Sequence, residues 1–485
     1  MRTRICLYIL LLAPLAVYWQ TAFYDYGMTT DYANLRAGHD EPGHLVKESA
    51  SRGRPLYGAM LETSFSAISA VDQLRWMRLV TVGLLTVLGV VVWRQLYNSG
   101  WNEIDAAGIG LGVVLLPSAQ VLVGWASAWP QALTLLLAAA GFSAIETEIE
   151  RGGMKRVIAL LGGCMIYAAA SLIYQANVLF ALVIVTAVLL VRTGREPLSD
   201  VWWCSFHVAA VAAGLLVGHL VMSLLFSNGV FQPVVEPVGS VLSFLRYPLP
   251  NSFALFALND DEYTGVVLYW LTALAVAAAI FFAYRKIVAN ADAVIRRRGI
   301  YAVSALGIIT VIVCLVATDR IATYRVLFSL AGILLVLMTY SLRTLSVQKK
   351  MTWKHYAGLG LLSAFIAFLA YRNSFHLLAQ PQSVEWEEMR GAVLRASFAK
   401  PVRVHIITAA LSDRTTERTY GDEFGTVSSD DPEVAKSMFR VALGERFPDK
   451  LPKGGSYVLA ASDTVPAQGS YDLLIDMRKI KSVTP

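Results

Sequence analysis

About eleven apolar stretches, each long enough to cross a lipid bilayer, follow one another along this chain of 485 residues. A hydrocarbon core roughly 30 Å thick needs about twenty apolar residues in helical form, and backbone inside lipid must satisfy its own hydrogen bonds. The pattern therefore predicts an all-α, polytopic membrane protein. The predicted spans lie near residues 5–23, 78–97, 105–124, 129–147, 155–172, 175–192, 205–226, 264–284, 299–317, 323–342 and 357–371.

Basic residues are concentrated in every second connection between these stretches. The short connections near 125–128 and 173–174 contain none, whereas Arg2 and Arg4 precede the first stretch. Since cytoplasmic loops carry an excess of Lys and Arg, this pattern predicts a cytoplasmic N-terminus and a C-terminal tail outside the cytoplasm. The net charge of +6 is thus a topology signal and does not indicate nucleic-acid binding. The first stretch lacks a small-residue cleavage site, which favours a retained anchor.

Three longer polar regions fall on the predicted outer face: residues 24–77, 227–263 and 372–485. We therefore divide the chain into a transmembrane module over 1–371, with the first two regions as outer loops, and an extracytoplasmic domain over 372–485. Alternating apolar residues in this last region are typical of a small α/β domain. Its predicted elements are the strands Val402–Ile407, Tyr457–Ala461 and Leu473–Met477 and a helix over 431–445.

The first polar region has the pattern of a folded segment. A short helix is predicted around Asp31–Ala37, and a second one begins at Pro55, a residue suited to the first helical position. Apolar residues recur at helical spacing after Pro55, so we expect an amphipathic helix along the membrane surface. These apolar residues are Leu56, Tyr57, Met60, Leu61, Phe65 and Ile68.

Acids, histidines and arginines gather in this same region. An Asp near the bilayer surface can act as a general base on a hydroxyl, and Arg side chains can hold a phosphate by paired hydrogen bonds. A solvated loop with ordinary surface charges remains the alternative reading. The candidates are Asp25, Asp31, Asp40, Glu41, His39, His44, Arg36 and Arg54.

Polar side chains also occur at the predicted outer ends of helices, where they face either a cavity or the membrane interface. They are Tyr174, Gln175 and Asn177 where the fifth and sixth spans meet, and Asp319, Arg320, Tyr324 and Arg325 where the ninth and tenth spans meet. In the tail, Asp422 and Glu423 lie between glycines, as a turn or a site element would. The histidines show no metal-ligand spacing, and the sequence contains no nucleotide-binding glycine motif.

Several of these fragments together resemble one family. Thr30–Arg36, followed by Gly53–Leu56, resembles the acid–Arg and "GRPL" signature of the serotype-converting O-antigen glucosyltransferases. Ser171–Gln175 is similar to the Tyr-Gln motif of that family, Tyr324–Phe328 to its later Arg-containing helix start, and Asp422–Gly425 to its tail motif. These matches are short, but they occur in order.

The resemblance implies a GT-C-type glycosyltransferase in the bacterial cytoplasmic (inner) membrane. The donor would be a polyprenyl-phosphate sugar, undecaprenyl-phosphate glucose for the family, and the acceptor a lipid-linked O-antigen or another surface glycan outside the cytoplasm. A flippase and a carrier-charging glycosyltransferase would be the partners. We expect no cofactor and no metal, because guanidinium groups can neutralise the departing phosphate.

The resemblance also implies roles for single residues. Asp31 would be the base of an inverting displacement. The other residues that it places at substrate are Asp25, Arg36, Arg54, Tyr174, Gln175, Arg325, Asp422 and Glu423. The family often has two adjacent acids where this chain has Thr30 and Asp31, so Asp25 or Asp40 is an alternative for the second acid.

Three other functions remain open at this point. A flippase or transporter of lipid-linked sugar would share an Arg-lined cavity, but it is typically built from repeated halves with broken helices, and the sequence shows no internal repeat. Another GT-C activity, such as a polymerase or a mannosyl or aminoarabinose transferase, would share the whole layout. A non-catalytic assembly factor would use its tail to bind a partner.

Overall fold

The computed structural model describes residues 2–192, 198–225, 242, 244–246, 248–258, 265–289, 293–294, 296–304, 323–348, 352–408, 423–425 and 427–478. Within these residues, seven helices are long and apolar enough to cross a membrane, and a bent helix pair would raise the number to eight. This is the architecture of a multi-pass integral membrane protein. The seven are Thr3–Phe23, Val71–Asn98, Ala126–Arg151, Gly153–Val178, Asp200–Leu225, Tyr324–Thr344 and Tyr356–Arg395.

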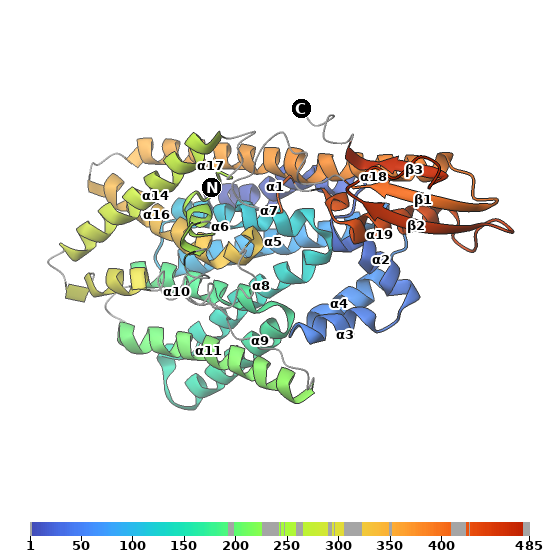
Figure 1. Cartoon of the computed structure of the whole chain (residues 1–485). Coiled ribbons are helices and arrows are strands. Elements are labelled where there is room, and N and C mark those ends of the chain that lie inside the picture. Colours follow the sequence, from blue (N-terminus) through green and yellow to red (C-terminus); the bar gives the residue numbers. More distant parts are fainter. Residues whose placement is uncertain are drawn as a thin grey trace.

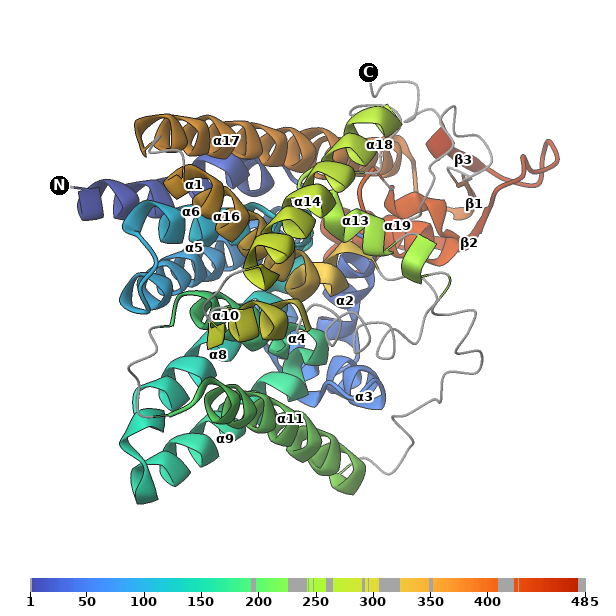
Figure 2. The ribbon, with the colours of Figure 1, turned by 90° about the vertical axis from the view of Figure 1, so that its left-hand side faces the viewer.

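The helical bundle places α1 and α17 on one side and α9 and α11 on the opposite side, as both views show (Figures 1 and 2). Its helices are α1 (Arg2–Phe23), α5 (Leu74–Asn98), α6 (Glu103–Leu115), α7 (Pro117–Gly124), α8 (Trp129–Glu146), α9 (Gly153–Val178), α10 (Phe180–Val191), α11 (Asp200–Leu225), α13 (Pro248–Phe253), α14 (Gly265–Val288), α16 (Phe328–Gln348) and α17 (Thr352–Asn373).

The expected number of about eleven spans is not confirmed. The predicted span 105–124 is a helix pair, α6 and α7, bent by 48° where Pro117 cannot donate a backbone hydrogen bond. The predicted span 175–192 corresponds to α10, which has only 12 residues, too few for a core that needs about twenty. The predicted span 299–317 and most of the loop 227–263 lie outside the described residues.

Close approach through glycines fixes α9 between its neighbours α8 and α11. A Cβ atom on Gly141 would lie 2.5 Å from the Tyr167 ring, and one on Gly214 would lie 2.4 Å from the Tyr167 Cβ. Small residues of this kind let helix backbones pack closely in membranes. The position of α9 matters because its last turns carry Tyr174 and Gln175.

The polar segments gather at one end of the bundle, which is on the right in Figure 1. They comprise α2 (Thr30–Asp40), α3 (His44–Ser51), α4 (Pro55–Ser66), the short turns η1 (Val71–Gln73) and η2 (Ala126–Ala128), α18 (Gln380–Arg395), η7 (Ser428–Asp430) and α19 (Pro432–Arg446). The helices predicted at Asp31–Ala37, at Pro55 and over 431–445 are confirmed as α2, α4 and α19.

The predicted strands are also confirmed, as β1 (Pro401–Ile407), β2 (Ser456–Ser462) and β3 (Leu473–Asp476). They form a parallel sheet of order β2-β1-β3. The helix of the last predicted span does not end at residue 371. It continues through a π-helical turn, Ser374–Ala379, into α18, so a helix that begins in the bundle reaches into the C-terminal part.

One apolar core joins the two polar regions. Tyr32 of α2 and Phe65 of α4 pack in the same buried cluster as Trp386 of α18 and Phe439 of α19. The Tyr32 and Trp386 ring centroids are 5.7 Å apart. The first outer region and the C-terminal part therefore form a single packed unit over the helix ends.

Candidate functional site

The Asp31 side chain is completely buried in the first turn of α2. Its Oδ2 atom accepts hydrogen bonds from the backbone N–H groups of Met28 at 2.9 Å and Ala126 at 3.3 Å. Its Oδ1 atom accepts from the Ser127 N–H at 2.9 Å and from the Ser127 hydroxyl. A carboxylate offers about four lone-pair positions, so all of them are occupied here. The turn η2 thus closes over Asp31.

Arg78 of α5 is a completely buried cation whose charge acts on this carboxylate. It donates to the backbone carbonyls of Tyr26 at 2.7 Å and Tyr24 at 3.2 Å, and its guanidinium lies 3.9 Å from the centre of the Tyr26 ring. Burial raises the pKa of the Asp31 carboxyl. The hydrogen bonds, with the Ser127 hydroxyl first among them, and the Arg78 charge act in the opposite direction without cancelling the effect of burial.

The backbone just before α2 is strained and is held by the C-terminal part. Thr29 has φ 44° and ψ −106°, a conformation that costs energy for any residue other than glycine. Its N–H donates to the Ser428 hydroxyl oxygen at 2.8 Å, and that hydroxyl donates to Gln382 at 2.6 Å. Glu385 in turn accepts from the N–H groups of Ser428 at 2.9 Å and Ser429 at 2.5 Å. Residues of α18 and η7 therefore keep the strained segment in place.

Arg54, Tyr174 and Gln175, predicted from distant parts of the sequence, meet in the structure. Gly53 has a left-handed φ of 80°, which turns the chain before Pro55 begins α4. The Arg54 Nε atom donates to the Gln175 side-chain oxygen at 3.3 Å, and Gln175 donates to the Gly53 carbonyl at 2.7 Å. The Arg54 guanidinium lies 4.5 Å from the centre of the Tyr174 ring. Tyr174 has non-helical backbone angles, which break α9 at this point.

Tyr57 links this group to the buried carboxylate. Its hydroxyl donates to the Ser127 carbonyl at 2.7 Å, and the same Ser127 residue binds Asp31. Burial raises the pKa of Tyr57 to about 12, while the charges of Arg325 and Arg54 act to lower it. Both guanidinium groups therefore lie within electrostatic reach of one phenol that stays protonated at neutral pH.

Arg325 and Glu423, also predicted, form an ion pair. The Arg325 Nε atom lies 3.3 Å from a Glu423 carboxylate oxygen, and the guanidinium lies 4.6 Å from the centre of the Trp125 ring. Glu423 is buried, whereas the Arg325 side chain is 30% exposed. Trp125 directly precedes η2, so this pair adjoins the turn that covers Asp31.

The remaining candidates lie elsewhere. Arg36 is not joined to Asp31, because its side chain turns outward and pairs with Asp40 at 2.8 Å. Both residues and Asp25 line a hollow of about 910 Å³ between α2, η1, α18 and α19. Asp422 lies outside the described residues. Among those that are described, no three His, Cys, Asp or Glu side chains are grouped as metal ligands would be.

Sequence reasoning missed Arg78, Ser127 and Trp125, and it treated Tyr57 only as part of an apolar helix face. Arg78 had a usable signal, since a charged residue at the start of an apolar span usually has a partner inside the protein. The sequence feature that could have pointed to Ser127 is weaker: it is a hydroxyl group in a short loop without basic residues. Its contact with Asp31 is long-range and leaves no local pattern.

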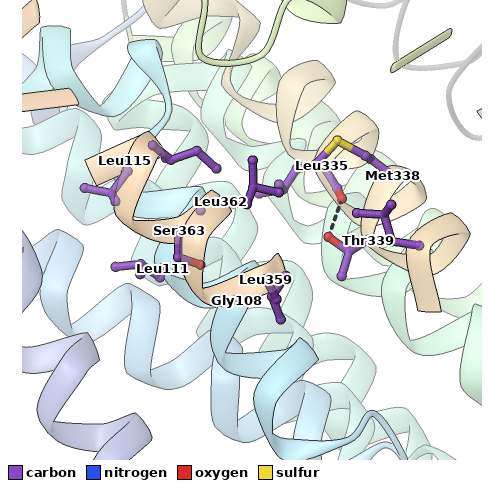
Figure 3. A pocket seen from close by; sticks show the side chains of 12 residues that line it. Gly108, Leu111, Leu115, Leu335, Met338, Thr339, Leu359, Leu362 and Ser363 are labelled. Atoms are coloured by element: carbon purple, nitrogen blue, oxygen red, sulfur yellow. Dashed lines mark hydrogen bonds between the residues drawn. The ribbon is translucent and has the colours of Figure 1, made fainter. Parts of the chain in front are cut away.

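A second cavity lies within the bundle and has a different character. It measures about 20 Å³ and is lined mainly by apolar residues of α6, α16 and α17, including Gly108, Leu335 and Leu359 (Figure 3). The Thr339 hydroxyl at its wall donates to the Leu335 carbonyl at 2.8 Å. A space of this size admits about one water molecule, so it cannot hold a sugar.

The candidate site is therefore the group around Asp31, Ser127, Tyr57, Arg54 and Arg325, at the end of the bundle that carries the polar segments. In comparisons with known proteins, no family model matches this chain and no curated protein matches it.

Proposed function

We propose that the chain is a GT-C-type membrane glycosyltransferase, which moves a sugar from a polyprenyl-phosphate carrier to a hydroxyl of a surface glycan. Glucose is the expected sugar, and the outer side of a bacterial cytoplasmic membrane is the expected location. One observation carries the proposal: Tyr57, three residues after Arg54, binds the Ser127 residue that holds Asp31, and Trp125, two residues before Ser127, packs against the Arg325 guanidinium. Two cations and a carboxylate are the groups that such a transfer requires.

The proposed reaction is a single displacement at the anomeric carbon. The acceptor hydroxyl attacks this carbon as its proton passes to Asp31, and the new glycosidic C–O bond forms. The bond from the anomeric carbon to the phosphate oxygen breaks, and the carrier phosphate leaves with the electron pair. Arg54 and Arg325 stabilise the charge of the departing phosphate. The configuration of the anomeric centre is inverted.

The four donors around Asp31 set a condition on this role. Three of them are backbone N–H groups in fixed positions, whereas the fourth is the Ser127 hydroxyl, which can rotate about its side-chain bond. The acceptor hydroxyl would replace the Ser127 hydroxyl at Oδ1. Asp25 is the alternative base, and its position at the wall of the 910 Å³ hollow favours it on grounds of access.

The test is transfer of radiolabelled glucose from undecaprenyl-phosphate glucose to a lipid-linked glycan, with purified protein in lipid vesicles. We expect Asp31→Asn to abolish transfer and Glu48→Gln to leave it unchanged, since Glu48 pairs with Arg52 on the exposed helix α3. Asp25→Asn is measured in parallel. If Asp25→Asn loses transfer while Asp31→Asn keeps full transfer, Asp25 is the base.

Folding is controlled separately. The amide nitrogen of an Asn at position 31 cannot accept from the backbone N–H groups that Oδ2 binds, so thermal melting and donor binding are recorded for each variant. Wild-type rates of transfer in both Asp31→Asn and Asp25→Asn would refute both assignments. Movement of lipid-linked sugar across the vesicle membrane, without any glycosidic bond formed, would replace the transferase by a flippase.

A further inference from the structure

A large hollow lies beside α2, at the end of the bundle that carries the polar segments. It measures about 910 Å³ and is bounded by α2, the segment around η1, α18, α19 and the start of β2. Ligand pockets typically enclose about 300–1,000 Å³, so this one has room for a ligand larger than a single sugar ring. Figure 1 shows α2 between α4, which carries Tyr57, and α19.

Charges of both signs line this hollow in nearly equal number. The basic residues are Arg36, Arg390, Arg440 and Lys450. The acidic residues are Asp25, Asp40, Asp72, Glu445 and Asp449. A site for a polyanion would need a clear excess of positive charge, which this wall lacks. Such a balance suits a ligand whose own groups both donate and accept hydrogen bonds, as sugar hydroxyls do.

Partly exposed aromatic rings add the apolar surface that the C–H face of a sugar requires. Phe447 and Tyr457 line the hollow and are each half-buried. The Tyr457 ring is held by Phe439, at 5.6 Å between ring centroids, and the Phe447 ring by Phe398, at 6.1 Å. Rings fixed in this way provide flat contact area at low entropic cost.

Part of the wall is rigid and part is available to a ligand. Glu445 accepts from the Val71 N–H at 2.8 Å and lies 3.9 Å from Arg390. Arg440, half-buried on α19, has no carboxylate within 4.0 Å among the residues that the structure describes, although Lys436 on the same helix pairs with Glu433 at 2.7 Å. Its five N–H donors are thus available to hydroxyl groups in the hollow.

Helix α2 connects the hollow to the candidate base. Leu35 lines the hollow, and Asp31 lies four residues before it on the same face of α2. Asp31 faces the turn η2 and the arginine group beyond it. A glycan that contacts Leu35 in the hollow would therefore lie about one helical turn from Asp31 along α2.

We propose that this hollow binds the acceptor as a neutral or zwitterionic oligosaccharide, held by Arg440 and the acidic wall through its hydroxyls and by Tyr457 and Phe447 through its C–H faces. This inference rests on the proposed transferase function, because it assigns the acceptor of that reaction.

The test measures glycan binding directly, apart from transfer. The probe is the oligosaccharide repeat released by mild acid from the surface polysaccharide of the cells that carry the gene. Its affinity for the full-length protein in lipid nanodiscs is measured by titration calorimetry. Gly444→Trp should fill the hollow without disturbing the fold, because a Cβ atom at this exposed position meets no atom within 4 Å. Arg440→Gln removes the charge and leaves two of the five N–H donors on a shorter side chain, and Lys436→Trp and Lys436→Gln are the matched controls on α19.

We expect Gly444→Trp to abolish binding and Arg440→Gln to weaken it about tenfold, with wild-type affinity in both Lys436 variants. Donor binding should be equal in all of them. Wild-type glycan affinity in Gly444→Trp would overturn the inference, as would failure of the wild-type protein to bind any repeat. So would tighter binding of a polyanion such as heparin than of the repeat. The transferase proposal survives these outcomes if the donor is still consumed in transfer, and it fails separately if the donor is neither bound nor used.

Discussion

The guanidinium of Arg54 lies over the ring of Tyr174, 4.5 Å from its centre. The contact exists because the backbone departs from helical geometry in both segments. Gly53 turns the chain before α4, and Tyr174 has non-helical backbone angles within α9. Gln175 bonds to both sides of the junction, through the Arg54 side chain and the Gly53 carbonyl. A cation is thus fixed on an aromatic face at the end of a membrane helix, where a carrier phosphate would arrive.

The first prediction concerns this cation. Arg54→Gln removes the charge and the stacking, so we expect transfer to fall about 10²-fold, the loss typical of one preorganised donor at a developing negative charge. The apparent affinity for the polyprenyl-phosphate donor should fall as well, because the charge also acts before the reaction. Arg52→Gln is the control, since Arg52 lies two residues away and pairs with the exposed Glu48 at 2.7 Å. Equal activity of both variants would exclude Arg54 from the donor site.

The second prediction concerns the pH dependence of transfer. Burial raises the pKa of Asp31 above its ordinary value of 3.8, and the Ser127 hydroxyl is the foremost of the groups that lower it. Ser127→Ala removes that hydroxyl, so the pKa should rise further. A base must be deprotonated, and the acid limb of the pH–rate profile should therefore move to higher pH in this variant.

The same shift has a consequence for stability. The folded protein binds the Asp31 proton more tightly than the unfolded chain, so this group favours folding most below pH 3.8. Its contribution is lost as pH rises from there through the raised pKa. Ser127→Ala should widen this window in thermal melting followed against pH. An acid limb that is unchanged in Ser127→Ala, in a protein that still melts cooperatively, would argue that Asp31 does not control the rate.

Local patterns were sufficient to predict much of the fold. Alternating apolar residues located β1, β2 and β3, and Pro55 located the start of α4, because strand periodicity and helix initiation are set by neighbouring residues. A connection between two spans was predicted at 173–174, where Tyr174 leaves helical geometry, although α9 continues to Val178. Span number was less predictable, since the apolar character of α10 does not reveal that its helix has only 12 residues.

The candidate site was predicted only in part. Arg54, Tyr174 and Gln175 were named and do meet, as do Arg325 and Glu423. The closure of η2 over Asp31 could not be predicted, because it joins residues 96 positions apart through backbone donors that any sequence possesses.

Arg36 lies apart from the Asp31 carboxylate and pairs with Asp40. The spacing of Arg36 and Asp40 on one helix favours a surface ion pair, which is what forms. The resemblance to the glucosyltransferases had assigned Arg36 to the site instead. Arg36 also lines the hollow proposed for the acceptor, so its role at substrate stays a prediction.

The third prediction tests membrane orientation. In a variant without the native cysteines, Asp463→Cys places a thiol on the exposed loop after β2, and Asn98→Cys places one at the opposite end of α5 from Asp72. The distribution of basic residues predicts that the first lies outside the cytoplasm and the second inside. A membrane-impermeant maleimide should label intact spheroplasts at position 463, and position 98 only after permeabilisation. The reverse order would invert the topology and remove the proposed site from the outer face.

The last prediction concerns Glu385, which joins the C-terminal part to the segment before α2. Glu385→Ala would leave the N–H groups of Ser428 and Ser429 without their acceptor in a buried place, at a cost of about 1–3 kcal/mol for each group. Since the Ser428 hydroxyl accepts from the strained Thr29, the backbone that presents Asp31 should loosen as well.

We therefore expect Glu385→Ala to lower the melting temperature and to reduce transfer more than donor binding, because Arg54 and Arg325 do not depend on this contact. Glu387→Ala, on the exposed side of α18, is the matched control and should change stability by less than about 0.5 kcal/mol. Limited proteolysis between residues 24 and 30 should be faster in Glu385→Ala than in the wild-type protein or in Glu387→Ala. Wild-type melting and proteolysis in this variant would mean that the bundle holds the strained segment without help from α18, and that the C-terminal part serves the site only through the hollow.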